Sequence, residues 1–93
     1  MIFRYSKSAL KELTDWKKAG QSKILAKIKD IQREIEMDPT ATAGKYSPEQ
    51  LKHDFSGWYS REITQKDRFV YRPHPTEEDI IEVIQCKGHY YDR

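Results

Sequence analysis

A periodic apolar segment organises the chain: Ile24-Leu25-Ala26-Lys27-Ile28-Lys29-Asp30-Ile31-Gln32-Arg33-Glu34-Ile35. Its isoleucines recur at spacings of four, three and four residues, and most of the other positions are charged or polar. This spacing places the isoleucines on one face of an α-helix, because an α-helix has about 3.6 residues per turn. The segment therefore predicts an amphipathic helix of about four to five turns. It should end before Pro39, which cannot continue a helix.

The residues before this helix predict a strand and another helix. Ile2-Phe3-Arg4-Tyr5 is typical of a short strand, and the hydroxyl of Ser6 is suited to cap a helix by accepting a free backbone N–H. One face of that helix is marked by Leu10, Leu13 and Trp16 or Lys17, and Gly20 is suited to close it. We expect the two helices to form a hairpin that packs on a sheet.

The second half of the chain predicts strands. Residues 39–50 contain two prolines, a glycine and small polar residues, which indicate a loop. Residues 58–64 and 68–72 read as strands joined by a short polar turn, and residues 80–86 form the most apolar strand. The expected fold is α+β, in the order β-α-α-β-β-β. Two N-terminal helices would pack on one face of a mainly antiparallel four-stranded sheet, in a single domain spanning residues 1–93.

Composition indicates a small globular protein of the cytoplasm. The chain has 93 residues, of which 37% are hydrophobic and 34% charged, and its aromatic residues argue against disorder. The only cysteine, Cys86, excludes an intrachain disulfide, suits a reducing compartment, and is best explained as core packing. No segment resembles a signal peptide or a membrane span, so we expect a soluble protein with no membrane partner.

Charge is distributed unevenly along the chain. Residues 1–33 hold nine Lys or Arg against three Asp or Glu, whereas residues 34–93 hold eight against twelve. The basic section would favour encounter with a polyanion such as RNA. On charge alone, an ordinary solvated, lysine-rich helix surface is the simpler interpretation.

Several kinds of site find no support in the sequence. There is no glycine-rich phosphate loop and no cysteine–histidine spacing suited to zinc. The acidic run Glu77-Glu78-Asp79 is best read as a solvated turn. We therefore expect neither a metal nor a cofactor. Three residues stand out near strand ends and in the central loop: Glu49, Arg68 and His89. Taken singly, each is adequately explained as solvated surface, and spacing alone does not gather them into one site.

Three ordered stretches carry a stronger signal. The first is Gly44-Lys45-Tyr46-Ser47-Pro48-Glu49-Gln50-Leu51-Lys52-His53-Asp54-Phe55-Ser56-Gly57-Trp58-Tyr59-Ser60-Arg61. The second is Ile63-Thr64 followed by Asp67-Arg68-Phe69-Val70-Tyr71, and the third is Cys86-Lys87-Gly88-His89-Tyr90. Together they resemble the YoeB/Txe toxins of type II toxin–antitoxin systems, within the wider RelE group. The resemblance implies a RelE-like fold.

The resemblance also implies roles for individual residues. Glu49 matches the family's general base, Arg68 its phosphate-binding arginine and His89 its general acid. The matches to substrate-binding positions are Lys52, His53, Arg61 and Tyr90. The chain departs from the family at Glu62, where a second arginine is common, and at Asp67, where histidine is common; Phe55 and Phe69 are apolar exchanges.

The implied function is a metal-independent endoribonuclease that cleaves mRNA in the ribosomal A site and leaves a 2′,3′-cyclic phosphate. Expected partners are the 70S ribosome, mRNA and a YefM/Axe-like antitoxin, and a homodimer is a further expectation. We expect Lys23, Lys27 and Arg33 of the basic section to contact the ribosome. Two alternatives remain open: a ParE-like gyrase inhibitor that acts by binding, and an RNA-binding or antitoxin-binding module without catalysis.

Overall fold

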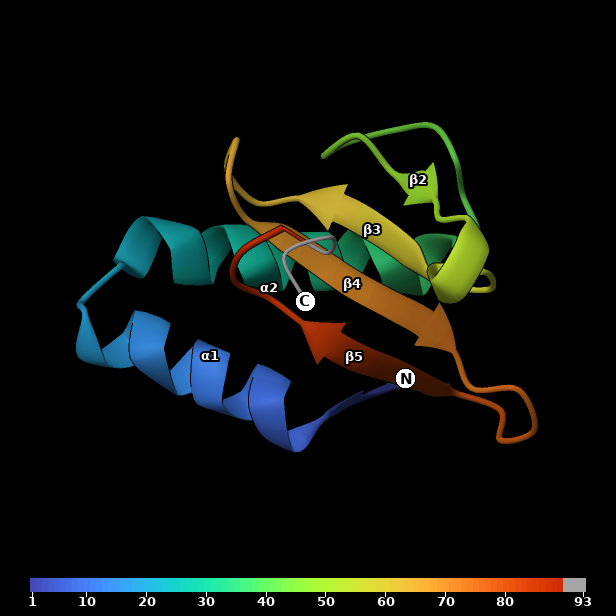
Figure 1. The fold of residues 1–93 in the computed structure, drawn as a ribbon, viewed down its shortest axis with the longest axis horizontal. Helices are drawn as coiled ribbons and strands as arrows, with labels where there is room; N and C mark the ends of the chain where they lie inside the picture. The colour runs from blue at the N-terminus through green and yellow to red at the C-terminus, as the bar shows by residue number, and fades with distance from the viewer. Residues whose placement is uncertain (90–93) are drawn as a thin grey trace.

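A computed structural model describes residues 1–89 of the chain (Figure 1). The described elements follow the order β-α-α-β-β-β-β with one short 3-10 helix. The strands are β1 (Ile2–Tyr5), β2 (Glu49–Gln50), β3 (Tyr59–Glu62), β4 (Arg68–Pro73) and β5 (Ile80–Gln85). The helices are α1 (Lys7–Lys18), α2 (Ser22–Met37) and the 3-10 helix η1 (His53–Phe55).

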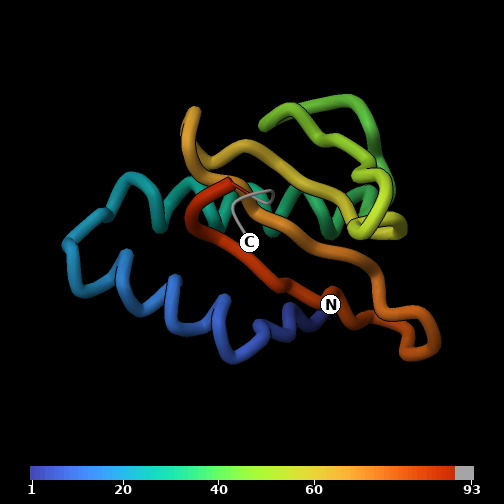
Figure 2. Tube along the Cα trace, viewed as in Figure 1, coloured from blue at the N-terminus to red at the C-terminus, as the bar shows by residue number. Residues whose placement is uncertain are grey.

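The described strands form one sheet with the order β1-β5-β4-β3-β2. β1 runs parallel to β5, and the other neighbouring pairs are antiparallel. A parallel pair needs a crossover connection, and here the chain leaves β1, passes through both helices and three strands, and returns as β5 beside it (Figure 2). The last strand therefore lies inside the sheet, next to the first.

Both predicted helices are present, and their ends follow the expected chemistry. The Ser6 hydroxyl accepts a hydrogen bond from the backbone N–H of Ala9 at 3.1 Å, which caps α1. Gly20, with a φ of +66°, follows the last residues of α1 in the left-handed conformation that favours glycine. α2 ends at Met37, two residues before Pro39, as predicted.

The core lies between the helices and one face of the sheet. Ala9 of α1 and three isoleucines of α2, Ile28, Ile31 and Ile35, are at most 3% exposed. Side chains alternate between the two faces of a strand, so every second strand residue points to this core. The strand and turn residues of the buried cluster are Ile63, Phe69, Tyr71, Ile81 and Val83, with Cys86 just beyond β5. We call this the helix-facing side, and the opposite side the outer face.

The fold class is as predicted, with one correction. The sheet of the described residues has five strands rather than four, because Glu49 and Gln50 pair with Ser60 and Tyr59 as the edge strand β2. The loop expected over residues 39–50 therefore ends in a strand. Two residues are too few for an alternating pattern to appear in the sequence. Among the described residues, no helix is both long enough and apolar enough to cross a membrane.

Candidate active site

Glu49 lies on the edge strand β2, with its side chain exposed. It pairs with Ser60 of β3, and Ser60 pairs with Val70 of β4, so the three residues form one row across the sheet. Ser60 and Val70 are 1% and 0% exposed but belong to the outer face. The Cα atoms of Glu49 and Val70 are separated by two strand spacings, roughly 10 Å.

The loop before Glu49 is anchored to α2. Tyr46 and Ser47 have φ values of +66° and +50°, an uncommon conformation for residues other than glycine, and Pro48 is buried. The Tyr46 hydroxyl donates to a carboxylate oxygen of Asp30 at 2.5 Å, and Arg33 donates to the other oxygen at 3.1 Å. These bonds, the Tyr46 bond foremost, hold the pKa of Asp30 down at about 2. The loop that leads into Glu49 is therefore tied to a charged group on the helix.

Arg61 secures the same loop from inside the molecule. It is only 2% exposed, and its guanidinium donates to the Tyr71 hydroxyl at 3.1 Å and to the backbone carbonyl of Lys45 at 3.0 Å. Burial raises the pKa of Tyr71, which keeps that hydroxyl protonated. A buried position does not suit the substrate contact expected of Arg61. We assign Arg61 instead to holding the loop that carries Glu49.

Arg68 begins β4 on the outer face, two residues and about 7 Å along the strand from Val70. Its Nη1 donates to the carbonyls of Thr64, Gln65 and Asp67, at 2.6, 3.2 and 3.2 Å. The guanidinium is therefore folded over the turn between β3 and β4. Glu62 stands directly opposite Arg68 on β3.

His89 follows β5 and is half-buried. The backbone carbonyl of Gly88 accepts a hydrogen bond from the backbone N–H of Arg68 at 2.9 Å. His89 therefore directly follows a residue that is bonded to Arg68. On the other side, α1 holds this segment: Glu12 accepts from the backbone N–H of Cys86, and the Trp16 indole donates to its carbonyl, both at 2.9 Å. The sheet thus brings the predicted acid to the neighbourhood of the predicted arginine.

The remaining predicted substrate-binding residues are Lys52, His53 and Tyr90. Lys52 and His53 are exposed at the start of η1, three and four residues after Glu49, and His53 has a φ of +57°. Tyr90 lies outside the described residues.

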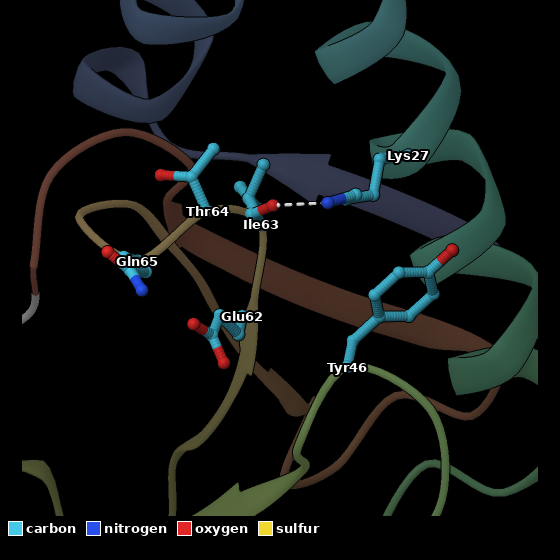
Figure 3. Close-up of a pocket in the computed structure, with 6 residues that line it drawn as sticks. All are labelled: Lys27, Tyr46, Glu62, Ile63, Thr64 and Gln65. Atoms are coloured by element: carbon cyan, nitrogen blue, oxygen red, sulfur yellow. Dashed lines mark hydrogen bonds between the residues drawn. The ribbon is translucent and has the colours of Figure 1, made fainter.

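The predicted ribosome contacts on α2 are all exposed, but two of them have partners. Arg33 forms a 3.1 Å ion pair with Asp30, and the Lys27 ammonium donates to the carbonyl of Ile63 at 2.8 Å (Figure 3). Lys23 lies one turn before Lys27, whereas Arg33 is six residues further on, about 240° around the helix. The three cations therefore do not form one compact patch.

The Lys27 bond closes one side of a cavity of about 310 Å³ at the end of β3 (Figure 3). Its lining residues are Lys27, Tyr46, Glu62, Ile63, Thr64 and Gln65. None of Glu49, Arg68 and His89 lines it, although it shares the β3–β4 turn with Arg68. We give this cavity no part in the candidate active site.

A polar network missed from the sequence crosses the outer face. The Arg72 guanidinium lies 4.4 Å from the centre of the Trp58 ring, and its Nε donates to Glu82 at 2.7 Å. The Nε2 atom of His74 lies 3.8 Å from a carboxylate oxygen of Glu82 and 3.4 Å from one of Glu77. Only the pairing of Arg72 with Glu82 on adjacent strands reveals this network, and that register is not visible in the sequence.

Metal-ligating side chains do not gather in residues 1–89: no group of three or more His, Cys, Asp or Glu side chains there could hold a metal ion. The outer face carries the Glu49 carboxylate on β2 and the Arg68 guanidinium on β4, and the His89 imidazole follows β5. These are the chemical types needed to take a proton, bind a phosphate and give a proton.

Comparisons with known proteins identify the family to which the chain belongs. The family model described as "YoeB-like toxin of bacterial type II toxin-antitoxin system" matches residues 5–90. The toxin YoeB of Escherichia coli O6:H1 is 37% identical over 68 residues, which cover 73% of this chain and 75% of that protein.

Solved structures give the same result. The YoeB/ParE toxin from Agrobacterium tumefaciens is 35% identical and superposes with a TM-score of 0.86, over 97% of this chain and all of that one. The toxin in a heterotetrameric YoeB–YefM toxin–antitoxin complex from Staphylococcus aureus is 27% identical, with a TM-score of 0.82 over 97% of this chain and 98% of that one. The chain therefore belongs to the YoeB-like toxins of bacterial type II toxin–antitoxin systems.

Proposed function

We propose that this protein is a metal-independent endoribonuclease that cleaves mRNA in the A site of the ribosome and so stops translation. The observation that carries the proposal is the common outer face of Glu49 and Arg68, together with the hydrogen bond that ties Gly88, the residue before His89, to Arg68. Family membership supports the same activity.

The proposed reaction is an attack by the ribose 2′-oxygen on the neighbouring phosphorus. Glu49 takes the proton of the 2′-hydroxyl while the new P–O bond forms. Arg68 contacts the phosphate oxygens as negative charge builds on them, and His89 gives a proton to the departing 5′-oxygen as the old P–O bond breaks. The products are a 2′,3′-cyclic phosphate and a free 5′-hydroxyl, with no change in oxidation state.

Arg68 suits this role because part of its guanidinium is already oriented. The three bonds from Nη1 to the turn carbonyls fix the plane of the group. Nε and Nη2 would then contact two phosphate oxygens at once, which a lysine ammonium cannot reproduce. A donor held in place before the reaction stabilises the transition state without reorganising.

The surrounding cations would hold the RNA. Lys52 and His53 are exposed beside the strand that carries Glu49 and would contact the backbone of the message. Tyr90, outside the described residues, would stack on a base. The exposed cations of α2, with Lys23 the foremost, would contact ribosomal RNA; reversing the charge of Lys23, Lys27 and Arg33 should weaken ribosome binding and flatten its salt dependence.

An antitoxin and a second copy of the chain are the proposed protein partners. Two of the similar structures, from Staphylococcus aureus, are a YoeB–YefM complex and a YoeB dimer. By analogy, a YefM-like antitoxin would hold this protein inactive in the cytoplasm, where ribosomes are found.

The decisive experiment maps message ends on programmed ribosomes. The protein is first treated with EDTA and is then mixed with ribosomes and mRNA. Primer extension locates new ends in the message. We expect codon-linked ends with the wild type, a cyclic phosphate on the upstream fragment, and loss of both with His89→Gln. Intact message with wild-type protein would overturn the proposal.

One observation favours a second candidate, a binding protein without catalysis. Glu62 stands opposite Arg68, so a carboxylate faces the place where the phosphate would bind and would repel it. A gyrase inhibitor of the ParE kind or an RNA-binding or antitoxin-binding module would tolerate this. Blocked translation with uncut message would favour the RNA-binding module, and inhibited DNA supercoiling would favour the gyrase inhibitor.

A further inference from the structure

We infer that Asp67 is a positioning residue that couples Arg68 to His89; the inference rests on the proposed function. Asp67 lies in the turn between β3 and β4. Its two carboxylate oxygens have different partners. Oδ1 accepts from the backbone N–H of Gly88 at 2.8 Å, and Oδ2 accepts from the Thr64 hydroxyl at 2.6 Å.

The first partner makes a two-bond clip between the turn and the C-terminal segment. Gly88 donates its N–H to the Asp67 carboxylate, and its carbonyl accepts from the backbone N–H of Arg68 at 2.9 Å. Both backbone groups of Gly88 are thereby bound to two adjacent residues, the last of the turn and the first of β4. Because His89 is the next residue, the clip limits the positions that its imidazole can take relative to Arg68.

The second partner makes the turn itself rigid. The Thr64 oxygen that donates to Asp67 also accepts from the backbone N–H groups of Lys66 and Asp67, both at 3.1 Å. Arg68 then covers the carbonyls of the same turn through Nη1. The Asp67 carboxylate is therefore bound to a turn that also orients the guanidinium.

Gly88 is the residue that makes the clip possible. Its φ is +80°, in the left-handed region that favours glycine. Among residues 1–89, a Cβ built there would meet only the Gln85 amide nitrogen, at 3.7 Å, which is an ordinary contact. The requirement for glycine is therefore conformational: the chain must turn so that the N–H of residue 88 reaches the carboxylate and its carbonyl reaches Arg68.

The segment before His89 is therefore held by hydrogen bonds from two sides. On the α1 side, Glu12 and Trp16 bind the backbone of Cys86. On the sheet side, Asp67 and Arg68 bind the backbone of Gly88. Removing the Asp67 carboxylate leaves only the Arg68 bond on the sheet side, so the imidazole is expected to move relative to the phosphate bound by Arg68. A displacement of about 1 Å in an active site can lower a rate by about 100-fold.

The test compares Asp67→Ala with Asp67→Asn, which keeps one acceptor oxygen for Gly88. We expect Asp67→Ala to lower kcat about 10- to 100-fold on programmed ribosomes with little change in KM, and Asp67→Asn to lose less. Asp38→Ala, which removes an exposed carboxylate at the end of α2, is the matched control and should cleave normally. Thermal unfolding of every variant separates a loss of position from a loss of folding.

Two further measurements identify the route. If Asp67 acts through the imidazole, Asp67→Ala should add nothing to the loss in His89→Gln, because the two changes act on one unit. Amide hydrogen exchange should show Gly88 exchanging faster in Asp67→Ala than in the wild type. The coupling would be overturned if the double variant lost as much activity as the product of the two single losses. An unchanged Gly88 exchange rate, or wild-type cleavage by Asp67→Ala, would also overturn it. A wild type that cuts no message would overturn the proposed function itself, and the coupling with it.

Discussion

On β4, Phe69 and Tyr71 point toward the helices and are fully buried, whereas Arg68 and Arg72 on the same strand point to the outer face and are half-buried. The first side is held together by apolar contact; for example, the centroids of the Phe69 and Tyr71 rings lie 5.9 Å apart. The second is held by hydrogen bonds and ion pairs. One strand thus separates a side that stabilises the fold from a side that offers chemistry, and mutations on the two sides should have different consequences.

The sharpest contrast should come from Glu49→Gln. Glu49 is exposed on an edge strand, so losing its charge should leave the melting temperature nearly unchanged, while removing a general base should slow cleavage about 100- to 10,000-fold. Single-turnover cleavage on ribosomes measures this. Gln50→Ala, the neighbouring residue on the other face of β2, is the control and should cleave normally. Normal cleavage by Glu49→Gln would remove the carboxylate from the mechanism.

The opposite result is expected for Phe69→Ala. This side chain is 0% exposed in the core between sheet and helices, so truncating it should cost about 3–5 kcal/mol of unfolding free energy. Urea unfolding measures the loss, and a protein of this size has little stability in excess. If the variant still folds at low temperature, its cleavage per folded molecule should stay close to that of the wild type. A stably folded variant without cleavage activity would contradict the claim that the helix-facing side serves stability alone.

Arg61→Met should fall between these extremes, because this buried cation serves both sides. The substitution keeps the volume but leaves the Tyr71 hydroxyl and the Lys45 carbonyl without their donor, at a cost of about 1–3 kcal/mol. Cleavage should also drop, since the freed loop carries Glu49. Arg33→Met, which removes an exposed cation of α2, should change unfolding by no more than about 0.5 kcal/mol. Urea unfolding of both variants, and the cleavage rate of Arg61→Met, check the comparison.

The difference between the sides also explains what could be predicted from the sequence. The helix-facing side follows from spacing: the isoleucines of α2 recur with the period of a helix, and their burial was expected. β2 escaped prediction because its pairing with β3 depends on partners nine and eleven residues away. The outer face depends almost entirely on such pairing. Resemblance to a family nominated Glu49, Arg68 and His89, whereas spacing alone did not connect them.

Two residues show why the remainder was hidden. Arg61 was expected to contact the substrate, but its position in β3 turns it to the helix-facing side, where it donates to the Tyr71 hydroxyl and to the Lys45 carbonyl. Asp67 lies 21 residues before the amide that it binds. This hydrogen bond exists only because β4 and β5 are neighbours in the sheet, so no local sequence pattern predicts it. Strand register, rather than residue type, decides both cases.

The smallest effect should be a dependence of stability on acid. Asp30 has a pKa of about 2 in the folded protein against 3.8 as the ordinary value. A lowered pKa contributes stability that is present above pH 3.8 and is lost as pH falls through about 2. Tyr46→Phe removes the largest cause of the shift, so its unfolding free energy should decline less between pH 4 and pH 2 than that of the wild type. Tyr59→Phe, which removes a phenol hydroxyl elsewhere on the sheet, should keep the wild-type slope. Urea unfolding at pH 2, 3, 4 and 5 tests this, and parallel curves for Tyr46→Phe and the wild type would show that the loop before Glu49 is not held by this bond.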